Sequence, residues 1–325
     1  MNKTLKIVLM VLLAAGLLVL PFLFKNYRVF QFNLVLVYAV AVLGLNLLTG
    51  FNGQISLGHG AFYAVGAYAA AMLMSMAGWP YWATLPVSAL VCFILGFLMG
   101  FPALRLGGHY LALATFAFAL AVPQLLKYKK IEHLTGGVQG IVLSKPDAPF
   151  EFRFLNQPLS ADRWLYFFTL IVAALMFLIA WNLLRGRIGR ALIAIRDHPI
   201  AATAMGINLP LFKSMAFGVS AAFTGVAGGL GAICVAFVSP DSFTVFLSIT
   251  FLVGVVVGGL ASIPGAIFGA AFIQFVPNIA DEISKSAPWA IYGAVLILLM
   301  YLMPSGVMGL LRSLWARLRP APARG

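Results

Sequence analysis

Residues 32–50 read Phe32-Asn-Leu-Val-Leu-Val-Tyr-Ala-Val-Ala-Val-Leu-Gly-Leu-Asn-Leu-Leu-Thr-Gly50, and this stretch contains no charged side chain. An α-helix needs roughly 20 mostly apolar residues to cross the hydrocarbon core of a bilayer. The stretch therefore predicts a transmembrane helix. Further apolar runs of similar kind occupy residues 5–24, 57–77, 81–100, 107–126, 163–184, 214–236, 246–262, 265–280 and 288–306. We expect an all-α membrane protein, a polytopic bundle of about ten transmembrane helices within a single domain, residues 1–325.

The composition agrees with a chain whose natural solvent is the bilayer. Of its residues 62% are hydrophobic and 9% are charged, and the mean hydropathy is +1.02. Soluble domains are about half apolar and a quarter charged. The net charge of +13 lies in short gaps between apolar runs, which indicates membrane orientation signals and no nucleic-acid partner. Cys92 and Cys234 both fall inside apolar runs, so we expect neither a disulfide framework nor a metal site.

Three apolar runs differ from a plain crossing. Residues 5–24 are longer than the core of a cleaved signal peptide, and we interpret them as a retained first helix. Residues 57–77 and 265–280 are rich in Gly and Ala, and the second run is short for a crossing. Either of them could be broken or re-entrant, because such segments are tolerated where protein or a cavity surrounds them. The helix count is therefore eight to ten.

The distribution of charge predicts the topology. If the N-terminus is cytoplasmic and ten spans alternate, the inner side holds 12 of the Lys and Arg residues and one acid, Asp197, whereas the outer side holds 9 cations and 7 acids. The positive-inside rule favours this orientation. Loop 127–162 is then periplasmic, loop 185–213 is cytoplasmic, and both termini are cytoplasmic with a short basic tail over residues 307–325. Lys25, Arg28 and the cluster 127–130 do not fit the rule.

The positions of the acidic residues restrict the energy source. None of the eight Asp and Glu residues lies in a predicted span. Proton-coupled transporters keep ionisable residues in the membrane, so the sequence argues against proton coupling, while sodium coupling through carbonyls stays open. A catalytic pair of intramembrane carboxylates is also excluded, and no phosphate-binding loop is present. The chain is thus expected to be no enzyme and to bind no cofactor, and ATP energy would have to come from a partner.

The cytoplasmic segment 185–206 predicts a basic amphipathic part followed by a short helix rich in alanine. Asp197 and His198 stand where a helix cap belongs, Pro199 suits a first turn, and Gly206 suits a left-handed stop. The helix presents small residues that could enter a groove on another protein, namely Ala201, Ala202 and Ala204, with Met205 beside them. An ordinary orientation loop explains the same residues equally well.

Polar residues near membrane depth follow the first quoted run. They are Asn46, Asn52, Gln54, Ser56 and His59, interleaved with glycines that let helices approach closely. These groups either line the path of a solute or tie helices together by hydrogen bonds. For any single one of them we favour the structural interpretation.

Four stretches together resemble the permeases of branched-chain amino acid ABC importers, specifically the M-type subunit. They are residues 44–68, 104–118, 135–140 and 189–208, and they keep the order of that family. The resemblance implies the ABC importer permease fold and alternating access powered by other subunits. The implied partners are a second permease of H-type, two cytoplasmic ATPase subunits and a periplasmic solute-binding protein, in the cell inner membrane.

The resemblance also implies roles for particular residues. A coupling contact with the ATPase would involve Arg190, Arg196, Asp197, Pro199, Ala201, Ala202, Met205 and Gly206. A binding-protein contact would involve Gly136, Gly137 and Gln139. The translocation path would include Asn46, Gln54, Ser56 and His59. The implied solutes are leucine, isoleucine and valine; relatives carry urea, short amides or other amino acids, and an ion-coupled secondary transporter is the other alternative.

Overall fold

The computed structural model describes residues 16–105, 108–148, 153–154, 157–285 and 287–318. Within these residues, seven helices are long and apolar enough to cross a membrane, or up to eight if a bent helix pair forms one span. The all-α polytopic architecture is therefore confirmed. Three of the ten expected spans are not among the seven helices. Most of 5–24 lies outside the described residues, the helix within 57–77 has only 17 residues, and 107–126 counts only through the bent pair.

Two helices form the centre of the bundle. They are α2 (Asn26–Asn46) and α10 (Leu209–Val235), whose most apolar windows are 72% and 83% buried. Helix α10 packs against α2, α3 (His59–Ser75) and α4 (Tyr81–Arg105). Its glycines allow this close packing, because lipid-immersed helices associate through small residues and not through a hydrophobic driving force.

The outer helices expose large apolar side chains. Helix α7 (Ala161–Arg185) exposes Ile171, Leu175 and Leu178, and α4 exposes Leu90, Ile94 and Leu98. Helix α13 (Pro288–Leu302) has no buried residue at all, and it is followed by α14 (Gly306–Leu318). Helix α5 (Gly108–Leu126) exposes Leu113 and Leu120. Such faces suit contact with lipid tails or with a second membrane subunit.

Each of the two unusual spans contains one continuous helix, but the backbone is broken just before the first, in the segment 47–58 that we call the broken span. Helix α2 runs on into a π-helical turn, η1 (Leu47–Phe51), after which the backbone is non-helical from 53 to 58 and α3 begins at His59. In contrast, residues 265–280 belong to α12 (Gly265–Ile283), which has 19 residues and contains Pro277. Helix α11 (Val245–Gly258) precedes it across a short turn.

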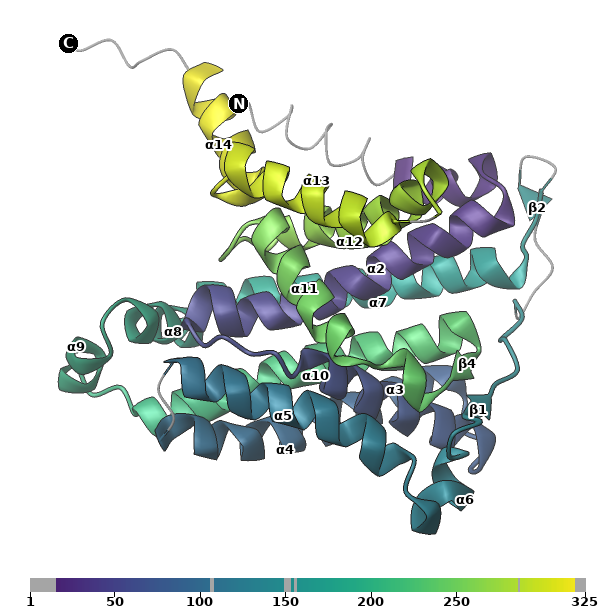
Figure 1. Ribbon diagram of the computed structural model, residues 1–325, viewed down its shortest axis with the longest axis horizontal. Helices are drawn as coiled ribbons and strands as arrows, with labels where there is room; N and C mark the ends of the chain where they lie inside the picture. Colours follow the sequence, from purple (N-terminus) through teal and green to yellow (C-terminus); the bar gives the residue numbers. More distant parts are fainter. Residues whose placement is uncertain (1–15, 106–107, 149–152, 155–156, 286, 319–325) are drawn as a thin grey trace.

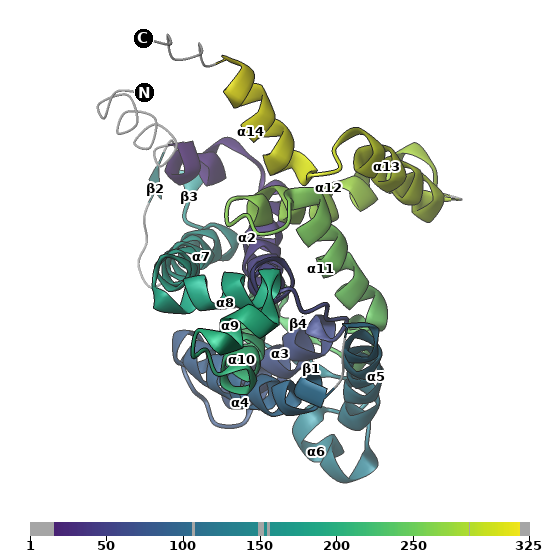
Figure 2. The ribbon, with the colours of Figure 1, turned by 90° about the vertical axis from the view of Figure 1, so that its left-hand side faces the viewer.

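The two long loops emerge at opposite ends of the bundle. Helices α8 (Arg187–Asp197) and α9 (Pro199–Ala204) lie at the left in Figure 1 and face the viewer in Figure 2. The other end contains a 3-10 turn (Lys129–Ile131) and α6 (Glu132–Thr135). The strand β1 (Ile141–Val142) follows and pairs antiparallel with β4 (Phe237–Val238). A second 3-10 turn (Pro240–Ser242) comes after β4. The short strands β2 (Arg153–Phe154) and β3 (Gln157–Pro158) pair in the same loop. As expected, the described residues of loop 127–162 form turns and short strands and no further crossing.

Candidate functional site

Local signals position the short helix α9. The side chain of His198 caps it by accepting a hydrogen bond from the backbone N–H of Ala201 at 3.3 Å, and Pro199 is its first residue. Gly206 follows with a φ of +84°, a left-handed conformation that favours glycine. The capped and glycine-terminated helix is therefore as expected, except that Asp197 takes no part in the cap and instead accepts a hydrogen bond from Arg196 Nε.

The exposed surface of α9 differs in one residue from the expected one. Ile200 and Met205 are 78% and 83% exposed, and Ala201 and Ala204 are exposed too. Ala202 is only 3% exposed, so its methyl group packs inside the chain and its expected place on the docking surface is wrong. An exposed apolar group of this kind, at the end of a membrane bundle, suits contact with another protein.

Arg196 and Arg190 also differ from each other in their surroundings. Arg196 is expected in the coupling contact with the ATPase, and in the structure its Nη1 donates to the carbonyl oxygen of Gly50 at 2.9 Å. Arg190 is exposed, and its guanidinium reaches only the carbonyl oxygen of Arg185 at 3.4 Å. Of these two cations, only Arg196 connects α8 to the broken span.

Asn46 holds two helix ends together next to this break. Its amide Nδ2 donates to the carbonyl oxygen of Ser262 at 2.9 Å, and its Oδ1 accepts from the backbone N–H of Ala261 at 3.0 Å. The side chain is fully buried and so satisfies two backbone groups in the turn between α11 and α12.

His59 lies in a chain of buried hydrogen bonds. Ser220 Oγ donates to the carbonyl oxygen of Gly44 at 2.6 Å, so we assign His59 Nε2–H as the donor to Ser220 Oγ, also at 2.6 Å. His59 Nδ1 lies 3.0 Å from Ser56 Oγ. The ring therefore ties the start of α3 to α2 and α10.

The amino end of α3 is satisfied by hydroxyl groups from other helices. The backbone N–H of Leu57 donates to Thr115 Oγ1 of α5 at 2.9 Å, and that of Gly60 donates to Ser248 Oγ of α11 at 2.8 Å. Sequence reasoning missed both residues, because a Ser or Thr within an apolar run gives no sign of its distant partner.

The four expected path residues are thus brought together around the break, but none is open to a solute in this conformation. Asn46, Ser56 and His59 are 0% exposed and Gln54 is 7% exposed. Gln54 Oε1 accepts from Asn52 Nδ2 at 2.7 Å. Along the break the exposed residues are instead Gly53 and Ile55, the latter 48% exposed. The structural interpretation of the polar groups fits these contacts.

At the opposite end the expected binding-protein segment is a fixed turn. Gly136, Gly137 and Gly140 have φ values of +71°, +55° and +76°, and Thr135 Oγ1 accepts from the N–H of Gly137 and donates to the carbonyl of Leu126. Gly137 is buried whereas Gln139 is exposed. An open cavity of about 550 Å³ lies beside this segment, between Trp79, Tyr81 and Ser144.

An ion pair accounts for one of the cations that did not fit the charge rule, Lys127. Lys127 pairs with Asp241, and Lys145, also counted on the outer side, pairs with Asp162. Each links one outer segment to another, so these lysines are partly neutralised by acids. At the α8–α9 end the one ion pair in the described residues joins the neighbours Arg196 and Asp197.

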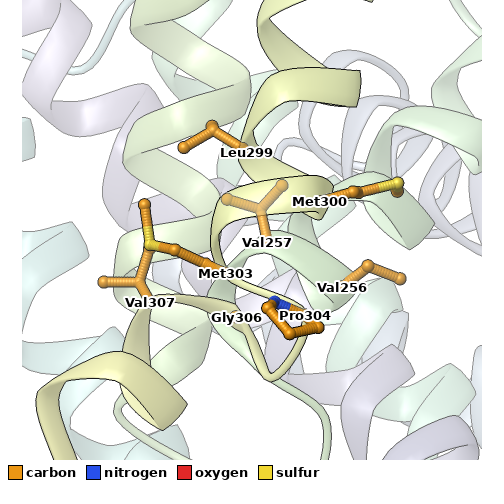
Figure 3. A pocket seen from close by; sticks show the side chains of 8 residues that line it. All are labelled: Val256, Val257, Leu299, Met300, Met303, Pro304, Gly306 and Val307. Atoms are coloured by element: carbon orange, nitrogen blue, oxygen red, sulfur yellow. The ribbon is translucent and has the colours of Figure 1, made fainter.

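Two apolar cavities between the described helices are too small for a polar solute. One of about 40 Å³ lies between the end of α11 and the turn from α13 to α14; Figure 3 shows it lined by hydrocarbon and thioether side chains. A second, of about 100 Å³, lies between α7, α8 and α10 and is lined by leucine, isoleucine and other apolar residues. Among the described residues no group of three or more His, Cys, Asp or Glu could hold a metal ion.

Comparisons with known proteins give a consistent result. Residues 28–304 match the family described as branched-chain amino acid transport system, permease component. The high-affinity branched-chain amino acid transport permease LivM of Salmonella typhimurium is 33% identical over 94% of this chain and 75% of its own length. LivM of Escherichia coli is 33% identical over 90% of this chain and 72% of its own length. The permease LivH of Salmonella typhimurium is 24% identical over 84% of this chain and 91% of its own length.

Proposed function

The chain belongs to the family of branched-chain amino acid transport system permease components, and we propose from this that it moves leucine, isoleucine and valine across the inner membrane. In this proposal it is one permease subunit of a binding-protein-dependent ABC importer. Its two faces alternate in opening to either side of the bilayer, and separate subunits hydrolyse ATP. The chain itself performs no covalent chemistry and binds no cofactor.

The observation that carries the coupling role is the exposed helix α9. His198 caps this helix and Gly206 ends it. Its exposed residues are Ile200, Ala201, Ala204 and Met205, at the end of the bundle where α8 also lies. A partner with a groove would bury these residues. We propose that this partner is one of two cytoplasmic ATPase subunits.

The remaining partners follow from the same membership. Since both LivM and LivH are similar to this chain, a second permease related to LivH is the proposed partner in the membrane. The turn at 136–140, with the exposed Gln139, is the proposed contact for a periplasmic solute-binding protein. The α8–α9 end is then cytoplasmic, as are both termini.

The proposed solute is a zwitterion without net charge. Every acidic residue that the structure describes lies in a loop, in a short helix or near the end of a long one. The amide and hydroxyl side chains at the break carry no charge, and Arg196, which reaches the break from α8, is paired with Asp197. An unpaired charge at membrane depth is costly, so a path of this kind suits a solute with no net charge. Urea or a short amide satisfies the same condition, which makes the choice of solute a matter for measurement.

Uptake into proteoliposomes tests the proposal. We expect the complex of both permeases, the ATPases and the binding protein to accumulate radiolabelled leucine only with ATP, with competition from isoleucine and valine. ATP-dependent uptake of urea without leucine would contradict the proposed solute. Leucine uptake driven by a sodium or proton gradient without ATP would instead support a secondary transporter.

A further inference from the structure

The side chain of Arg196 extends from the last turn of α8 into the broken span. Its guanidinium donates to the carbonyl oxygen of Gly50 at 2.9 Å, and its Nε is held by Asp197 Oδ1 at 2.9 Å. Its methylene groups lie against Gly53, where an added Cβ would come within 2.9 Å of Arg196 Cγ. Arg196 therefore contacts Gly50, in the last turn before the helix ends, and Gly53, in the non-helical backbone that follows.

The carbonyl of Gly50 is a chemically suitable target for a cation. It lies in the π-helical turn η1 that ends the α2 span, and the last carbonyls of a helix lack partners within it. A guanidinium at this position satisfies such a carbonyl and complements the negative end of the helix dipole. Charge-assisted hydrogen bonds of this type are stronger than those between neutral groups.

Gly50 in turn contacts the next turn of backbone directly. An added Cβ there would overlap Asn46 Oδ1 and would lie 2.5 Å from the backbone nitrogen of Ala261. The side chain of Asn46 already binds Ala261 and Ser262. A continuous set of hydrogen bonds and close contacts thus runs from α8 through Arg196, Gly50 and Asn46 to the turn between α11 and α12.

Helix α8 also adjoins α9, because the single residue His198 ends α8 and caps α9. We propose that Arg196 is a positioning residue that makes α8 and the broken span 47–58 move together, so that motion of α9 reaches the membrane helices. This inference rests on the proposed function and assigns one residue to the transmission step. Without the Arg196–Gly50 contact, ATP hydrolysis would continue, but less solute would be transported for each ATP hydrolysed.

The test compares two cations of the same helix. Arg196→Gln removes the charged donor at Gly50, whereas Arg187→Gln removes an exposed cation at the start of α8 that lies outside the expected coupling contact. Leucine transported per ATP hydrolysed is measured in proteoliposomes that contain the full complex. We expect this ratio to fall at least about five-fold in Arg196→Gln and to stay near the wild-type value in Arg187→Gln.

Several outcomes would overturn the inference. An unchanged ratio in Arg196→Gln, even with less assembled complex, would show that Arg196 is merely structural. An equal loss in Arg187→Gln would show a general charge effect. If the wild-type complex transported no leucine with ATP, the proposed function itself would fail, and this control separates the two failures.

A cysteine pair keeps the inference testable if Arg196→Gln does not assemble. The Cβ built at Gly53 lies 3.5 Å from Arg196 Cβ, within the range of a disulfide. In the double variant Gly53→Cys/Arg196→Cys, oxidation should restore the ratio that Arg196→Cys alone loses, and a reductant should abolish the recovery. If the oxidised double variant transports as little leucine per ATP as Arg196→Cys, the proposal that α8 and residues 47–58 move together is contradicted. The native Cys92 and Cys234 are both buried, so the wild type serves as the oxidation control.

Discussion

Single glycines set how closely the central helices approach. At Gly66 of α3 an added Cβ would meet the backbone of Gly225 of α10, with the Cα at 2.5 Å. Backbone atoms cannot move aside as the end of a flexible side chain can. Gly66→Ala should therefore push α3 and α10 apart and destabilise the purified permease by ~1–3 kcal/mol, the usual cost of overpacking. Thermal unfolding in detergent measures this change.

Gly293 of α13 provides a matched control for that substitution. It also lies in a membrane helix, but an added Cβ there would meet nothing within 4 Å. Because alanine has the higher helix propensity, Gly293→Ala should leave the unfolding temperature unchanged or raise it slightly. Equal destabilisation by both substitutions would argue against the close contact of α3 and α10.

The residues around α9 and the break show what the sequence can and cannot predict. Pro199 and Gly206 act locally, through a fixed φ and a left-handed φ, so the sequence predicted both ends of the short helix correctly. The burial of Ala202 was not predictable, since every neighbour in that helix is small or apolar and no face stands out. Thr115 and Ser248 satisfy the start of α3 from distant helices, and only the tertiary structure brings these groups together.

At the scale of one element, a substitution in α9 can distinguish a loss of ATPase binding from a loss of permease stability. Ala204 is exposed on α9, so Ala204→Arg should leave the permease folded while placing a long charged side chain in the proposed contact with the ATPase. Such a clash costs ~1–3 kcal/mol. We expect the ATPase subunits to bind roughly 5 to 150 times more weakly. Co-purification and titration of ATPase binding to the solubilised permease pair measure the effect.

Ala202→Arg and Ala204→Ser complete the comparison. Because Ala202 is 3% exposed, arginine there should reduce the stability of the permease itself, together with any binding. Serine at 204 keeps the surface small and should bind the ATPase as the wild type does. Normal ATPase binding and normal uptake by Ala204→Arg would remove the docking role and leave the segment as an orientation signal.

At the scale of the whole molecule, the two ends of the bundle differ in charge. In the described residues, the end with α8 and α9 carries Arg185, Arg187, Arg190 and Lys213 beside the acid Asp197, whereas the lysines of the other end lie among the acids Glu132, Asp147, Asp162 and Asp241. Loops with excess Lys and Arg stay in the cytoplasm. The proposed orientation therefore places α9 inside and the segment 141–147 outside.

Cysteine labelling of intact cells tests this orientation directly. Ser144 and Met205 are both exposed. They follow β1 and α9, which lie at opposite ends of the bundle in Figure 1. The native Cys92 and Cys234 are buried and provide a background that does not react. A maleimide that cannot cross membranes should label Ser144→Cys in cells with a permeabilised outer membrane. It should label Met205→Cys only in inverted inner-membrane vesicles. The reverse pattern would invert the topology and place α9 on the side where no ATPase subunit could reach it, so that the proposed coupling would fail with it.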